Sequence, residues 1–115
     1  MNVLIQLKDA SADREIREFT QGKNREVFIT HSPEDSVKVL SQVTIDEAVI
    51  SIKGLKDAAI LKYINDYYPK TKVTVIINKV FEDVLAIFQH SDYTVIHEPL
   101  KLSELKSRIL KVQPH

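Results

Sequence analysis

Cysteine is absent from the 115-residue chain, and glycine occurs only twice, at Gly22 and Gly54. Without cysteine the chain cannot form disulfides, thiolate zinc sites or a cysteine nucleophile. Phosphate-binding loops of the Walker and dinucleotide types need several glycines in one loop, because their backbone N–H groups must approach the anion closely. The chain has no such cluster, so a nucleotide-binding enzyme of either type is not expected.

An excess of charge of either sign is also missing, since 16 Lys and Arg residues balance 16 Asp and Glu residues. A general nucleic-acid binder would show a basic excess, so we expect no direct binding of nucleic acid. The longest apolar runs span only a few residues, too short to cross a membrane, and no signal-peptide pattern opens the chain. We expect a cytoplasmic protein without membrane contact, with one hydrophobic core and one domain over residues 1–115.

Five short runs rich in β-branched residues have the length and composition of strands. They cover residues 3–7, 27–29, 48–52, 73–77 and 94–96. The segments between and after them carry apolar residues at helical spacing. These stripes are Ile16 and Phe19; Val37 and Leu40; Ile60, Ile64 and Tyr67; Val84 and Phe88; and Leu102, Leu105, Ile109 and Val112. The pattern predicts five strand–helix units, with Tyr67 in the core and Tyr63 and Tyr68 less buried.

Helix boundaries are marked by capping residues and prolines. Ser32 before Pro33 is a strong start signal, with serine as the N-cap and proline at the first helical position. Asp57 is a candidate cap for the third helix. Pro69 disfavours helical geometry at Tyr68 and is expected to end that helix.

Regular alternation of strands and helices predicts an α/β fold in which helices cover both faces of a parallel sheet. The runs near residues 3, 48 and 73 are almost continuously apolar, as central strands should be. The runs near residues 27 and 94 are shorter and have polar flanks, as edge strands should have. We therefore predict a three-layer α/β/α sandwich of the flavodoxin-like type, with strand order 2-1-3-4-5.

Five segments carry a resemblance to a known family: residues 3–9, 47–52, 60–64 with 68–69, 73–78 and 98–105. Through them the chain resembles the CheY-like receiver domains of two-component response regulators along nearly its whole length. The resemblance implies a site in which an aspartate at the end of the third strand accepts a phosphoryl group. Two acids after the first strand hold Mg²⁺, and a hydroxyl and a lysine after the fourth and fifth strands contact the phosphate.

The positions that would carry this chemistry hold other residues. They are Leu7 and Lys8, or Lys8 and Asp9, at the acidic pair; Ser51 or Ile52 at the nucleophile; Asn78 at the hydroxyl; and Glu98, directly before Pro99, at the lysine. Asp9 alone cannot hold Mg²⁺ against water, and Lys8 would repel the cation. Serine at neutral pH is a poor phosphoryl acceptor without a base. We therefore expect a pseudo-receiver that keeps the fold, has lost the phosphorylation chemistry, and uses no cofactor.

Lys8 and Glu98 reverse the charges that the family places after the first strand and before the proline. We therefore expect these two side chains to form an ion pair. Asp57, which closely follows the third strand, is expected on the third helix and outside the pocket. The histidines do not form a metal site in this arrangement, because His31 and His97 lie at opposite edges of the predicted sheet, ~19 Å apart.

The resemblance also implies partners, namely signalling proteins or an output domain that follows the chain in a longer regulator. Receivers usually make contacts through the fourth helix, fifth strand and fifth helix, and a homodimer could form there. In this chain Leu85, Tyr93, Leu100 and Leu102 lie in that region. The resulting hypothesis is non-catalytic signal transduction by protein–protein contact.

Two alternatives remain open from the sequence. One is a phosphorylation-dependent receiver with a displaced acid site built from Asp9 and Asp57. The other is a regulatory module that binds a small anion through Lys8, Lys53 and Asn78.

Overall fold

The computed structural model describes residues 1–8, 10, 13–20, 25–83 and 93–98. The elements in chain order are β1 (Asn2–Gln6), α1 (Asp13–Thr20), β2 (Glu26–Thr30), α2 (Pro33–Gln42), β3 (Glu47–Ile52), α3 (Leu55–Tyr67), β4 (Lys72–Ile77), the 3-10 helix η1 (Lys79–Phe81) and β5 (Tyr93–His97). All five predicted strands are confirmed, with ends that differ by at most one residue. The predicted fourth and fifth helices fall outside the described residues, apart from the start of the fourth.

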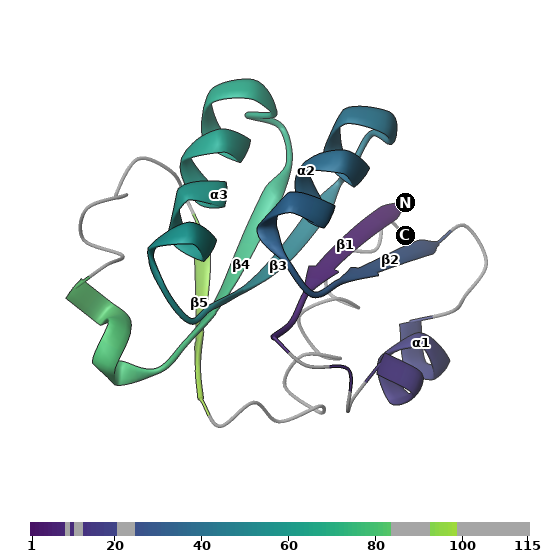
Figure 1. The fold of residues 1–115 in the computed structure, drawn as a ribbon. Helices are drawn as coiled ribbons and strands as arrows, with labels where there is room; N and C mark the ends of the chain where they lie inside the picture. Colours follow the sequence, from purple (N-terminus) through teal and green to yellow (C-terminus); the bar gives the residue numbers. More distant parts are fainter. Residues whose placement is uncertain (9, 11–12, 21–24, 84–92, 99–115) are drawn as a thin grey trace.

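The five strands form one parallel sheet in the order β2-β1-β3-β4-β5, which confirms the predicted topology (Figure 1). In the register, Gln6 of β1 lies beside Ile50 of β3, and Ile52 of β3 lies beside Ile77 of β4. All six residues of β3 are buried, as expected for a central strand covered on both faces. Because every strand runs the same way, the residues that follow the strands gather at one edge of the sheet.

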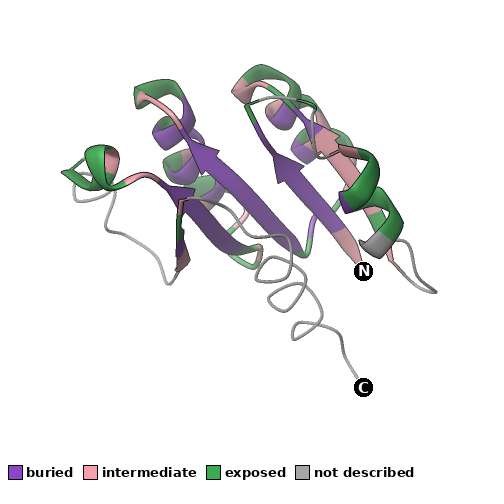
Figure 2. Ribbon diagram, turned by 90° about the horizontal axis from the view of Figure 1, so that it is seen from below, coloured by how far each residue is buried: buried purple, intermediate pink, exposed green. Residues whose placement is uncertain are grey.

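Side chains alternate between two apolar clusters, one on each face of the sheet. Leu4, Ile50 and Val75 point toward α2 and α3, whereas Val3 and Ile5 belong to the cluster that contains Ile16 of α1. Figure 2 shows the buried residues concentrated in the strands and on the inner sides of the helices. The described helices thus cover both faces, which confirms the α/β/α sandwich.

The predicted helix signals act as expected at α2 and at the end of α3. The Ser32 hydroxyl accepts a hydrogen bond from the Asp35 N–H at 3.2 Å, and Pro33 opens α2. Helix α3 ends at Tyr67, two residues before Pro69. At its start, Gly54 occupies the N-cap position and provides no side-chain cap. Asp57, the predicted cap, lies in the first turn instead and accepts from the N–H of Lys53, which precedes the helix.

The prediction for the tyrosines of α3 is wrong. Tyr67 is 68% exposed, whereas Tyr63 and Tyr68 are partly buried and pack against the core on the α2 and α3 face. The reason lies in the spacing, because the step of four from Ile60 to Ile64 continues to Tyr68 and passes over Tyr67. Among the described helices, none is long and apolar enough to cross a membrane.

Candidate functional site

The carboxyl-end edge of the sheet is where this architecture binds its ligands. The described residues that occupy the receiver-like positions lie at this edge. Leu7 and Lys8 follow β1, Ser51 and Ile52 end β3, Asn78 follows β4, and Glu98 follows β5. Asp9 and Pro99 lie outside the described residues, so the acidic-pair prediction is placed only in part.

Neither the last two residues of β3 nor the residue that follows them carries a carboxylate. Ile52 is fully buried and belongs to the core cluster beneath α2 and α3. Ser51, one residue earlier, is also buried inside the sheet. The next residue is Lys53, whose side chain is cationic. An alkane, an enclosed hydroxyl and an ammonium therefore occupy the place where a carboxylate would be needed.

Glu98 forms its ion pair with Lys53, so the predicted pair with Lys8 is wrong. The Lys53 ammonium donates a hydrogen bond to Glu98 Oε1, and both side chains are partly buried. The backbone N–H of Glu98 also donates to the carbonyl of Ile77 at 2.9 Å. Lys8 is exposed, and within the described chain it has no ion pair within 4 Å.

Strand order explains this choice of partner. β5 lies two strands from β3 but three strands from β1. At ~4.8 Å per strand, a residue after β5 is ~10 Å from the end of β3 and ~14 Å from the end of β1. Lys53 is therefore the nearer cation, and its pair with Glu98 ties the loop after β3 to the end of β5.

A buried chain of hydrogen bonds, here called the Asp57 network, connects the other strand ends. Asp57 Oδ1 accepts from Gln6 Nε2 at 3.0 Å, and Asp57 Oδ2 accepts from the Lys53 N–H at 2.9 Å. Ser36 donates its hydroxyl to Gln6 Oε1 at 2.6 Å. Since the Ser36 hydrogen is used there, the 2.6 Å contact with Thr30 requires the Thr30 hydroxyl to donate.

The Asp57 network corrects the prediction for Asp57. Asp57 lies on α3 as expected, but it is not outside the pocket, because it bonds Gln6 at the end of β1. Only Lys53 and Gly54 separate β3 from α3, and this short connection brings the first turn of α3 against the strand ends. Sequence reasoning missed Gln6. Its signal was a polar side chain inside an apolar strand, which must find hydrogen-bond partners when buried.

Asn78 caps the short helix that follows β4. Its side-chain Oδ1 accepts from the Val80 N–H at 3.0 Å and so caps η1. The predicted contact residues Leu85, Leu100 and Leu102 lie outside the described residues, as does the side chain of Tyr93. That predicted interaction surface remains a prediction.

Two histidines, one near each edge strand, form hydrogen bonds that join separate segments of the chain. His31 Nδ1 bonds the Leu7 carbonyl at 3.0 Å, and its Nε2 bonds Asp13 Oδ2 at 2.8 Å. Both partners only accept, so the two bonds coexist only when the ring carries both protons. At the opposite edge of the sheet, Nε2 of His97, the last residue of β5, bonds Glu82 Oε1 at 2.8 Å. The described residues contain no group of three or more His, Cys, Asp or Glu side chains arranged to hold a metal.

Comparison with known proteins gives a result only at the level of structure. No family model and no curated protein sequence matches the chain. A signal receiver domain of an HD domain-containing protein from Pseudomonas fluorescens Pf-5 matches with a TM-score of 0.79 and 12% identity, over 96% of this chain and 90% of that one. The REC domain of AraT, a response regulator from Geobacillus stearothermophilus, matches with a TM-score of 0.76 and 20% identity, over 96% and 91%. A response regulator from Thermotoga maritima matches with a TM-score of 0.75 and 18% identity, over 96% and 94%.

The chain has the fold of a CheY-like receiver domain. On this receiver fold, the carboxylates of Asp57 and Glu98 at the ligand-binding edge already have partners. A cation that recruited them would have to displace an ammonium from Glu98 and two N–H donors from Asp57. In the described part of this edge, the carboxylate contacts therefore join loops and a helix to the ends of the strands.

Proposed function

We propose that this domain works in signal transduction as a receiver-like module that does not use aspartyl phosphorylation. It acts without catalysis, through contact with other proteins in the cytoplasm. The observation that supports this most directly is the end of β3, where the buried Ser51 and Ile52 occupy the position expected for the phosphoryl acceptor and the ion-paired Lys53 follows. Transfer to a carboxylate also needs a cation to offset charge repulsion, and Lys8 beside the edge disfavours one.

The displaced-site alternative has one observation in its favour, which is that Asp57 lies at the ligand-binding edge. Its geometry argues against that alternative. Both Asp57 oxygens accept hydrogen bonds, one of them from the buried Gln6 amide. A phosphoryl group on either oxygen would disturb the bond which that oxygen accepts, and on Oδ1 it would leave the Gln6 donor without its acceptor in the interior, which costs ~1–3 kcal/mol.

The small-anion alternative is also weakened by the contacts of its residues. The charge of Lys53 is offset by Glu98, so this lysine is already paired with a carboxylate. Lys8 remains exposed at the edge. A single exposed lysine does not make an anion site.

Partners in this proposal are signalling proteins or an output domain. The face around Leu85, Tyr93, Leu100 and Leu102 is the proposed contact surface, and a homodimer could use the same face. Sedimentation of the purified chain over a range of concentrations tests the homodimer directly.

Treatment with acetyl phosphate and Mg²⁺, and separately with beryllofluoride and Mg²⁺, tests the central proposal. Intact mass and backbone amide spectra are recorded, with an active receiver domain treated in parallel as the positive control. We expect no phosphoryl adduct and no ordered amide shifts in this chain. A stoichiometric adduct that disappears in Asp57→Asn would establish the displaced-site alternative and overturn the proposal.

A further inference from the structure

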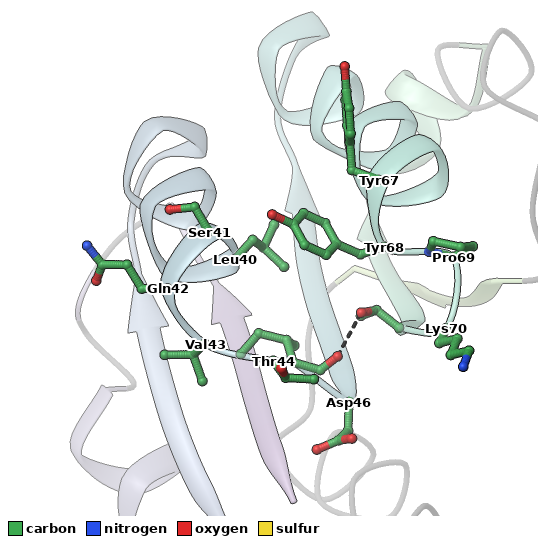
Figure 3. A pocket seen from close by; sticks show the side chains of 12 residues that line it. Leu40, Ser41, Gln42, Val43, Thr44, Asp46, Tyr67, Tyr68, Pro69 and Lys70 are labelled. Carbon is green, nitrogen blue, oxygen red and sulfur yellow. Dashed lines mark hydrogen bonds between the residues drawn. The ribbon is translucent and has the colours of Figure 1, made fainter.

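A cavity of about 540 Å³ lies at the amino-end edge of the sheet, opposite the candidate site (Figure 3). Its walls come from the end of α2, the loop from α2 to β3, and the loop from α3 to β4. The volume lies within the ~300–1,000 Å³ range of small-molecule sites. Nothing in the proposed function uses this cavity, so the two can be tested separately.

Aromatic and aliphatic side chains form one side of the cavity. The ring of Tyr68 extends from the end of α3 toward Leu40 and Ser41 of α2 (Figure 3). The ring of Tyr63 packs against the ring of Tyr68, with ring centroids 5.7 Å apart. It also packs against the ring of Tyr67, with centroids 5.0 Å apart. The Tyr68 ring is therefore fixed by its neighbours and does not need to be ordered when a ligand binds.

Both helices direct the negative ends of their dipoles at this cavity. The last helical bonds run from the Val43 N–H to the Val39 carbonyl and from the Tyr68 N–H to the Ile64 carbonyl. The carbonyls after Val39 and Ile64 in the two helices therefore lack helical partners at the cavity edge. Each helix end is equivalent to about −0.5 charge, and neither last turn contains a basic residue that would offset it.

The lining contains one charged side chain of each sign. They are Asp46 and Lys70. Asp46 accepts a hydrogen bond from the Asn2 N–H at 2.8 Å, and its carboxylate points away from Tyr68 and Leu40 (Figure 3). Lys70 extends away from Tyr68 and Leu40, toward the outside of the loop (Figure 3). The cavity thus combines an aromatic wall with the carboxyl ends of two helices, which carry the negative ends of their dipoles.

We propose that this cavity binds a small organic cation, an amine or quaternary ammonium group carried on an apolar body. The cationic head lies near the end of α2, whose last carbonyls lack helical partners, and against the ring of Tyr68, and the apolar part contacts Val43. Aromatic rings attract such cations through their negative faces, and the two helix ends add to that attraction.

Choline and its uncharged isostere 3,3-dimethylbutan-1-ol are the probes that test the proposal. Each is titrated into the full chain while backbone amide shifts are recorded. Choline is expected to give saturable shifts at residues 40–46 and 67–71, and the isostere to bind about tenfold more weakly. Equal binding of the two compounds, or shifts confined to the carboxyl-end edge, would overturn the proposal.

Two variants with the same added charge separate binding from folding. Gln42→Lys places a cation at the end of α2, where it should leave the fold intact and weaken choline binding about tenfold or more. Ala59→Lys adds the same charge at an exposed position in the first half of α3 and should leave binding unchanged. If Gln42→Lys binds choline as tightly as the natural chain does, the proposed placement of the charge is wrong.

Discussion

Gln6 and Asp57, 51 residues apart in the sequence, are joined by a 3.0 Å hydrogen bond inside the protein. The bond fixes the end of β1 to the first turn of α3. The same carboxylate also holds the backbone of Lys53. One acidic side chain thus positions three segments at the edge where a receiver fold would carry its chemistry.

Removing the Asp57 carboxylate should lower the free energy of unfolding substantially. Asp57→Ala leaves the Gln6 amide and the Lys53 N–H without their acceptor, and we expect a loss of about 3 kcal/mol. Asp57→Asn keeps one acceptor oxygen and should lose less. Urea unfolding followed by circular dichroism measures both.

Asp66→Ala is the matched control, because Asp66 lies on the same helix and its bond to Lys62 is on the surface. It should cost much less than Asp57→Ala. Equal losses for the two variants would show that the Asp57 network does not stabilise the edge.

Glu47 should make stability depend on pH. Burial raises its pKa from 4.5 to about 7, although the hydrogen bond from Thr74 and the charge of Lys72 partly oppose this. Above pH 4.5 the unfolded chain releases a proton that the folded protein keeps, so the free energy of unfolding falls as pH rises toward 7. A shift of this size corresponds to roughly 3 kcal/mol.

Glu47→Gln should abolish this part of the pH dependence, since the amide resembles the protonated acid and does not ionise. Relative to the variant, the natural chain should lose stability between pH 4.5 and 7 and stay constant above that range. Glu26→Gln, at an exposed strand position, serves as the control. A constant difference between Glu47→Gln and the natural chain over this pH range would contradict the prediction.

Local patterns in the sequence were enough to predict the strands, their order, the start of α2 and the end of α3. They worked because alternation, apolar runs and capping residues are local signals that agree with the final packing. They also predicted which positions follow each strand, and the structure places Lys8, Ile52, Asn78 and Glu98 at one edge.

Contacts between side chains were harder to predict, because they depend on distances across the folded sheet rather than on local pattern. Glu98 pairs with Lys53 because β3 lies closer to β5 than β1 does. Asp57 reaches Gln6 because the connection before α3 is short. Neither distance is encoded in residue spacing.

The Lys53–Glu98 ion pair should contribute little to stability despite its place in the site. Its side chains are 32% and 19% exposed, so water screens the attraction. A double-mutant cycle with Lys53→Ala and Glu98→Ala should give a coupling energy of ~1 kcal/mol or less. The same cycle with Lys8→Ala and Glu98→Ala should give no coupling. Coupling to Lys8 and none to Lys53 would reverse the assignment of the pair.

Tyr67 and Tyr68 are adjacent in sequence but should respond very differently to truncation. Tyr68→Ala removes a ring that packs against the core, and we expect a loss of about 2 kcal/mol in the free energy of unfolding. Tyr67→Ala removes a ring that is 68% exposed and should change stability by about 0.5 kcal/mol or less. Urea midpoints of the two variants measure the contrast. A greater loss for Tyr67→Ala would mean that the apolar stripe of α3 turns toward Tyr67 after Ile64, so the cavity beside Tyr68 would have a different wall.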